Sequence, residues 1–145
     1  MRIKFIASTL ALLALGFRAA GADQIEAALY FGENSPAPFF ARLAPPDLNE
    51  RLHQVFGFRH YELIKADKID LDRHGKQWFV PRRDFFICVR PLLPQPDEPR
   101  WVGYEIYQDG VMVAKGRYEA SEGTPLFING PDFRNGRLIL VLETR

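Results

Sequence analysis

The sequence has a single cysteine, Cys88, and this scarcity is its first informative feature. Disulfide-stapled domains carry an even set of cysteines, so this fold must close by burial of apolar side chains alone. Hydrophobic residues make up 47% of the chain and aromatic residues 13%, which is enough for one core. Because Cys88 is flanked by Phe86, Ile87 and Val89, we expect a buried and unreactive thiol.

Long hydrophobic runs are also lacking, apart from one at the N-terminus. There the basic residues Arg2 and Lys4 precede an apolar stretch over 5–17 and a small-x-small sequence at 20–22, a pattern typical of a cleaved signal peptide. The apolar stretch is shorter than the ~20 residues that span a bilayer. We therefore expect residues 1–22 to be removed and a single domain, 23–145, to start at Asp23. This domain is predicted to be periplasmic or secreted and to have no integral membrane segment.

The chain has no marked excess of charge of either sign. It contains 19 basic and 18 acidic residues, and removal of residues 1–22 leaves 16 basic against 18 acidic, a net charge of about −2. Proteins that bind nucleic acid or anionic lipid through their overall charge carry a basic stripe. The composition therefore predicts no nucleic-acid partner and gives no general electrostatic attraction to anionic lipid.

Residues for catalysis and metal binding are few and poorly spaced. Beyond residue 22 there are only two serines and two threonines, none in a G-x-S-x-G elbow, and the three histidines match no zinc motif. Residues 70–75 resemble the start of a calcium loop, but the twelfth position, which should be glutamate, is Pro81. A polar turn, in which the aspartate side chains hydrogen-bond to the nearby backbone, accounts equally well for residues 70–75. We predict no catalytic residue, no metal and no cofactor.

One helix is predicted, over residues 47–56. Asp47 is placed as its N-cap, with Glu50 completing a capping box, and Gly57 as its left-handed stop. Four apolar residues fall on one face, which must pack on a sheet because so short a helix is unstable alone: Leu48, Leu52, Val55 and Phe56.

The rest of the chain predicts strands and turns. Seven or eight short strands at spacings near ten residues indicate an all-β domain, either an antiparallel β-sandwich or a partly open barrel. The strands are expected at 25–31, 58–65, 76–80, 84–92, 101–108, 111–118, 125–128 and 137–143. In the last of these, residues 138–142 are apolar on both alternating faces, so it should be a central strand, covered by sheet or loop on one face and by the helix on the other.

The strongest local signal is Asp109-Gly110 between two β-rich runs. It predicts a two-residue type I′ hairpin, because both central residues accept positive φ at low cost. Such a turn sets Tyr107 opposite Met112 and Ile106 opposite Val113.

Exposed aromatic residues are the remaining functional candidates. Trp78, Trp101 and Tyr107 lie on predicted strands, where rings stack on sugars or anchor a partner protein, although cross-strand packing is the ordinary alternative. Phe39 and Phe40 lie in a proline-rich loop, and we expect this pair to pin the loop onto the domain in preference to forming a partner site.

These features favour a non-enzymatic binding or interaction module of the cell envelope, with another envelope or extracellular protein as its partner. A carrier of a small apolar or carbohydrate ligand is the alternative, and it requires a pocket of at least ~300 Å³. A glycan-acting hydrolase is a second alternative, and it requires two convergent carboxyl groups.

Overall fold

The structure is a computed structural model that describes residues 24–72, 75–92, 100–121 and 123–144. The predicted signal peptide, the predicted new N-terminus at Asp23, and His74 lie outside these ranges. Eight strands and one helix follow one another along the chain: β1 Gln24–Glu33, α1 Pro46–Phe56, β2 His60–Asp70, β3 Gln77–Arg82, β4 Phe85–Pro91, β5 Trp101–Gln108, β6 Val111–Glu119, β7 Leu126–Phe133 and β8 Gly136–Thr144.

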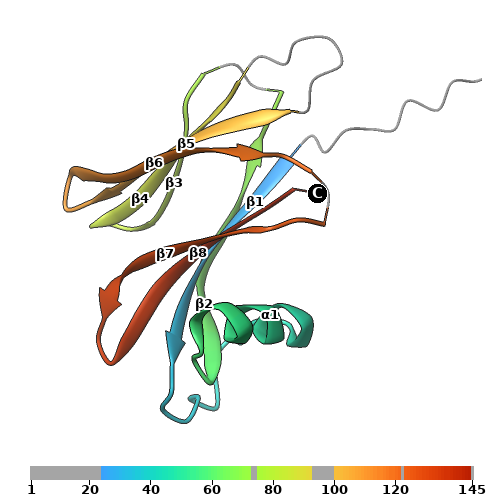
Figure 1. Cartoon of the computed structure of the whole chain (residues 1–145). Helices are drawn as coiled ribbons and strands as arrows, with labels where there is room; N and C mark the ends of the chain where they lie inside the picture. Colours follow the sequence, from blue (N-terminus) through green and yellow to red (C-terminus); the bar gives the residue numbers. More distant parts are fainter. Residues whose placement is uncertain (1–23, 73–74, 93–99, 122, 145) are drawn as a thin grey trace, which may run out of the picture.

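The strands form two antiparallel sheets of four strands each. Sheet A has the order β2-β1-β8-β7 and sheet B the order β3-β4-β5-β6. The sheets face each other and α1 lies on the side of sheet A away from sheet B (Figure 1). The all-β prediction is therefore confirmed, as a sandwich whose sheets do not close into a barrel.

Two apolar cores explain why β1 and β8 are hydrophobic on both faces. Between the sheets, the main core takes the alternate residues Leu138, Leu140 and Leu142 of β8. On the opposite face, Ile139 and Val141 join Leu52 of α1 in a smaller helix core. The prediction of a central last strand, covered by sheet and by helix, is confirmed.

The helix begins one residue earlier than predicted. Pro46 occupies its first turn, Pro45 is the N-cap, and no side chain caps the first amides. The predicted capping box is therefore wrong: the fixed φ of proline suits the first helical position, and this places Asp47 inside the first turn. Gly57 ends the helix with φ +78° as predicted, whereas Val55 is 59% exposed and does not face the sheet.

The β5–β6 hairpin has the predicted turn but not the whole predicted register. Asp109 and Gly110 both have positive φ, and Tyr107 pairs with Met112 as expected. Ile106 pairs with Ala114 and not with Val113, because a β-bulge inserts one residue next to this pair. Residues 129–133 lie outside the predicted strand 125–128 but continue β7 through an irregular register.

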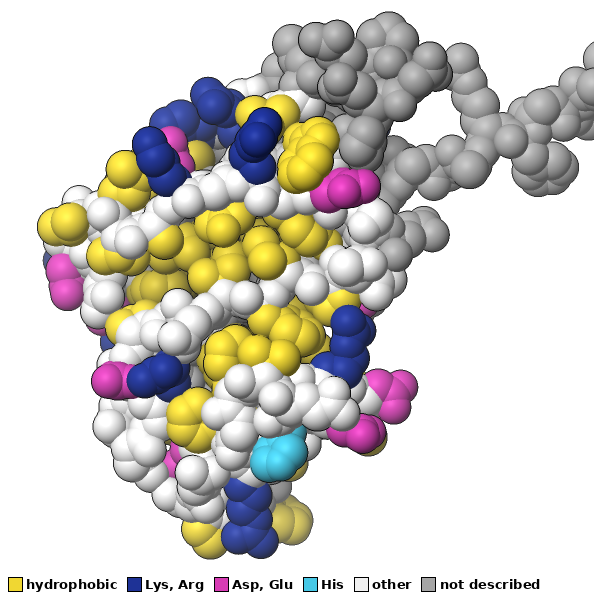
Figure 2. All heavy atoms as spheres, viewed as in Figure 1, with side chains coloured by type: hydrophobic (Ala, Val, Ile, Leu, Met, Phe, Trp, Pro, Cys, Tyr) yellow, Lys and Arg dark blue, Asp and Glu magenta, His cyan; other side chains and the backbone are white. Residues whose placement is uncertain are grey.

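The sandwich is closed on one side and open on the other. β2 packs near β3, whereas β6 and β7 are the end strands of their sheets, and no described strand pairs with their outer edges. A cavity of about 210 Å³ lies between them, lined by Val113, Ala114 and Pro131 among others. Figure 2 shows hydrophobic side chains in view between the two sheets. Among the described residues, no helix has the length and apolar character needed to cross a membrane.

Candidate ligand-binding face

The outer face of sheet B carries three of the five predicted interaction residues. On β4, the alternate residues Phe85, Ile87 and Val89 enter the main core, so Phe86, Cys88 and Arg90 face outward. The strand register places further outward side chains in rows across the sheet. One row is Trp78, Cys88, Glu105 and Lys115; a second is Arg90, Gly103 and Arg117; a third is Phe86, Tyr107 and Met112.

A pocket of about 550 Å³ lies in this face, and Gly103 is one of the residues that line it. Glycine leaves a depression because it has no side chain, and a Cβ built there would meet its nearest atom, Leu92 Cδ2, only at 3.6 Å. Four cationic side chains and one carboxylate line the pocket: Lys76, Arg90, Lys115 and Arg117, with Glu105. The pocket is therefore strongly positive in a protein whose predicted mature charge is slightly negative.

The cations are only partly neutralised. Lys76 Nζ lies 3.4 Å from Glu105 Oε2, and the guanidinium of Arg117 lies over the Trp101 ring at 5.4 Å. Within the described ranges, neither Arg90 nor Lys115 has a carboxylate within ion-pair distance. Two positive charges thus face the pocket with their hydrogen-bonding groups available to a ligand.

Glu105 is held in its ionised form. The Tyr107 hydroxyl donates a hydrogen bond to Glu105 Oε2 at 3.0 Å and, with the nearby Lys76 ammonium, lowers the pKa of this carboxyl. The same hydrogen bond raises the pKa of Tyr107. Glu105 therefore offers a fixed hydrogen-bond acceptor at neutral pH and not a proton donor.

Cys88 lies at the base of the pocket. It is only 2% exposed, which confirms the predicted burial, and burial raises the pKa of its thiol. Its side chain belongs to neither apolar core. The outward side chains of sheet B cover it.

Aromatic rings border the pocket at both ends. One end carries a cluster of three rings, those of Trp78, Phe86 and Tyr107. The Phe86 and Tyr107 rings are stacked with their centroids 5.1 Å apart, and the centroid of the Trp78 ring lies 5.6 Å from that of Phe86 and 5.7 Å from that of Tyr107. Trp78 is 50% exposed and offers ring surface to a ligand, whereas the other two rings cover each other. At the opposite end, Trp101 lies beside Arg117.

Phe39 and Phe40 lie elsewhere, in the connection between β1 and α1. Their side chains are 105% and 86% exposed, so the prediction that they pin the loop onto the domain is wrong. The loop is held by backbone hydrogen bonds and not by these rings: the Ala44 N–H donates to the Tyr61 carbonyl, and the Leu63 N–H donates to the Arg42 carbonyl. Because the main chain already fixes the loop, the rings are not needed for its attachment.

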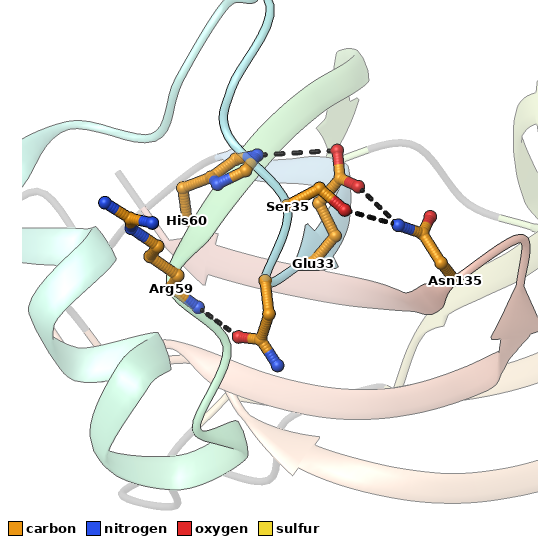
Figure 3. Close-up of polar contacts among 6 residues, drawn as sticks. Glu33, Ser35, Arg59, His60 and Asn135 are labelled. Atoms are coloured by element: carbon orange, nitrogen blue, oxygen red, sulfur yellow. Dashed lines mark hydrogen bonds and ion pairs between the residues drawn. The ribbon is translucent and has the colours of Figure 1, made fainter.

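A polar cluster near this loop resembles part of a catalytic triad. Glu33 Oε1 lies 3.5 Å from His60 Nε2, both residues are buried, and Asn135 donates to Glu33 at 3.0 Å and to Ser35 at 2.6 Å (Figure 3). Ser35 Oγ bonds the Asn135 amide, and no hydrogen bond joins Ser35 to His60 in this described part of the chain. The cluster ties the end of β1 to the β7–β8 turn and lacks the serine–histidine contact that catalysis requires.

Metal-binding geometry does not occur among the described side chains, where no three histidine, cysteine or acidic residues converge. In the segment that resembles a calcium loop, Asp72 N–H donates to Asp70 Oδ1 at 2.9 Å, as the turn interpretation predicted. Asp72 also forms an ion pair, in which its Oδ1 atom lies 3.6 Å from Nη2 of Arg100.

The pocket's basic residues and Phe86 were missed by sequence reasoning. Lys76, Arg90, Lys115 and Arg117 are far apart in the chain and come together only through the strand register. Phe86 could have been found, because one of two adjacent phenylalanines in a strand must face outward. Comparison of the chain with protein-family models, with curated proteins and with solved structures found no match.

Proposed function

We propose that this protein is an exported, non-enzymatic binding domain of the cell envelope that holds an acidic oligosaccharide on the outer face of sheet B. The observation that carries the proposal is the 550 Å³ pocket with four cationic side chains around one carboxylate. Its volume exceeds the ~300 Å³ that a small-ligand site requires. The proposal joins the binding module and the carbohydrate carrier predicted from the sequence, while export rests on the N-terminal residues alone.

The chemistry of the pocket matches a sugar that carries a carboxylate or sulfate. Arginine binds such groups with two parallel hydrogen bonds and lysine as a point charge, so Arg90 and Lys115 suit the anionic group. The ionised Glu105 accepts hydrogen bonds from sugar hydroxyls. Trp78 provides a half-exposed ring on which the apolar face of a pyranose packs.

Glycan hydrolysis is less well supported than binding. Hydrolysis by the common mechanism needs two carboxyl groups about 5–9.5 Å apart, one of them with a raised pKa to act as the acid. In the described lining of the pocket, Glu105 is the only carboxyl group, and its pKa is lowered. The residues therefore favour retention of a glycan over its cleavage.

Affinity electrophoresis through gels that contain polygalacturonate or neutral dextran tests the proposal. We expect retardation by polygalacturonate, weakened by added salt, and none by dextran. The double variant Arg90→Gln/Lys115→Gln should bind at least about tenfold more weakly, because it removes two charge-assisted hydrogen-bonding groups. The matched control is Lys68→Gln/Arg83→Gln, which removes two exposed cations that do not line the pocket.

A second variant separates pocket shape from charge. Gly103→Val fills the depression without removing a charge, and the space around Gly103 accommodates the added Cβ. It should abolish retardation while the melting temperature is maintained. Equal retardation of the wild type, the double variant and Gly103→Val, or equal binding of dextran, would overturn the proposal.

A further inference from the structure

We infer that Phe39 and Phe40 form a second, separate contact site, which docks onto the surface of an anionic lipid bilayer. The two rings are more exposed than any other large hydrophobic side chain in the described part of the chain. A soluble domain that buries its other phenylalanines at least in part has a reason to expose these two only if something else covers them.

The backbone presents the rings as a fixed tip. Ala41 N–H donates to the Pro38 carbonyl at 3.0 Å, which makes Phe39 and Phe40 the two central residues of a β-turn. The chain that follows is attached to β2 through the Leu43–Glu62 bridge and two backbone hydrogen bonds. The connection lies at the end of the molecule where β1 finishes (Figure 1). The backbone that carries the rings is therefore already ordered before the rings meet a partner, which lowers the entropy cost of binding.

The charge around the tip is positive, although the protein as a whole is not. Residues 34–46 contain no acidic residue and include Arg42, and Asn34 accepts a hydrogen bond from the Arg59 backbone at 2.9 Å, which brings Arg59 to the same end. Figure 2 shows Lys or Arg side chains beside hydrophobic ones at this lower end of the molecule. Two acidic residues lie next to the loop: Glu33 is buried with His60 and Asn135, and Glu62, which pairs with Leu43, is half-buried, so the exposed charge beside the rings is that of Arg42 and Arg59.

An apolar tip with adjacent arginines matches the boundary of an anionic bilayer. The rings enter the region between headgroups and acyl chains, and the guanidinium groups remain with the phosphates. A protein pocket also accommodates two rings, but it would have to carry acidic groups of its own beside them to match the arginines, whereas every anionic bilayer supplies phosphates next to its apolar region. The local charge therefore favours lipid over protein as the occupant.

Co-sedimentation with sucrose-loaded vesicles tests this inference. The full-length mature protein, 23–145, is mixed with vesicles of phosphatidylcholine alone or with 30% phosphatidylglycerol. We expect sedimentation with the anionic vesicles and at least tenfold less with the neutral ones. Phe39→Ser/Phe40→Ser should weaken partitioning by about 100-fold, since each ring buries enough area for about a tenfold effect. Its melting temperature should remain that of the wild type.

Two controls identify the contacting surface. Val55→Ser/Val111→Ser removes two other exposed apolar side chains and should leave sedimentation unchanged. Arg90→Gln/Lys115→Gln, in the sheet B pocket, should also leave it unchanged, so that failure of the glycan proposal and failure of this one are distinguishable. Lack of sedimentation by the wild type, undiminished sedimentation of the double phenylalanine variant, or loss only in the pocket variant would overturn the inference.

Discussion

Tyr61 joins the helix to sheet A through a buried hydrogen bond to Leu52. Its hydroxyl donates to the Leu52 carbonyl at 2.9 Å and accepts from the Phe58 backbone N–H at 3.2 Å. Both Tyr61 and Leu52 are fully buried. A single hydroxyl thus links the Leu52 carbonyl of α1 to the Phe58 amide, which lies just beyond the C-terminal end of the helix.

Removal of this hydroxyl should destabilise the domain. Tyr61→Phe leaves the Phe58 amide without its partner and removes the second hydrogen bond to the Leu52 carbonyl, which costs ~1–3 kcal/mol in a buried setting. Urea denaturation followed by circular dichroism measures the change. Tyr104→Phe is the control, because the Tyr104 hydroxyl makes no hydrogen bond among the described residues, and equal losses in the two variants would contradict the prediction.

Gly136 should tolerate no side chain, in contrast to Gly103. A Cβ at Gly136 would lie 2.0 Å from the Gly32 carbonyl oxygen, so Gly136→Ala must displace backbone at the junction of β1 and β8. We expect a loss of roughly 1–3 kcal/mol in the free energy of unfolding, typical of overpacking. Gly103→Ala, where space is open, should be neutral or stabilising by up to ~1 kcal/mol. Similar unfolding midpoints for both variants would refute this prediction.

Cys88 should react slowly and with a shifted pH dependence. Burial raises its pKa, and the Lys76 cation partly offsets this effect. The rate of reaction with a thiol reagent should therefore rise only above the ordinary thiol pKa of about 8.5. Lys76→Gln should move the rate profile to still higher pH, while Lys68→Gln should not. A midpoint at or below the ordinary value would show the thiol to be open to solvent.

The same shift predicts an effect on stability in alkaline solution. The thiol ionises in the unfolded chain before it ionises in the folded one. The contribution of the Cys88 thiol to the free energy of unfolding is therefore fully present below pH ~8.5, and it is lost as the pH rises through the higher pKa of the folded state. Cys88→Ser should reduce the decline in melting temperature between pH 8 and pH 10.

The fold was largely predictable because local patterns and the final packing agree. Residues 138–142 are apolar on both alternating faces, and only a central strand between two cores accommodates that pattern. The β5–β6 hairpin was predictable from Asp109-Gly110, because both central residues of a type I′ turn need positive φ and these two residue types accept it. The bulge beside Ile106 was not predictable, since it depends on how β6 meets β5 along their whole length.

The candidate site was predictable only in part. Trp78, Trp101 and Tyr107 stood out as large rings on strands, but their common face depends on strand order. Arg90 and Lys115 meet across β5, and their positions in the chain carry no sign of this. Phe39 and Phe40 were noticed correctly and interpreted wrongly, because burial area alone does not reveal that backbone hydrogen bonds already hold the loop.

The open side of the sandwich gives the pocket's cations a second consequence. β6 is an end strand with unpaired backbone along its outer edge in the described structure, and Val111, Met112 and Val113 are exposed on it. Such an edge is a template on which another chain adds as a further strand, and charged residues on the edge discourage this. Lys115 and Arg117 occupy that strand, so an antiparallel copy would bring like charges together. The variant Arg90→Gln/Lys115→Gln removes one of these two edge charges, so it should begin to self-associate at a lower protein concentration than the wild type.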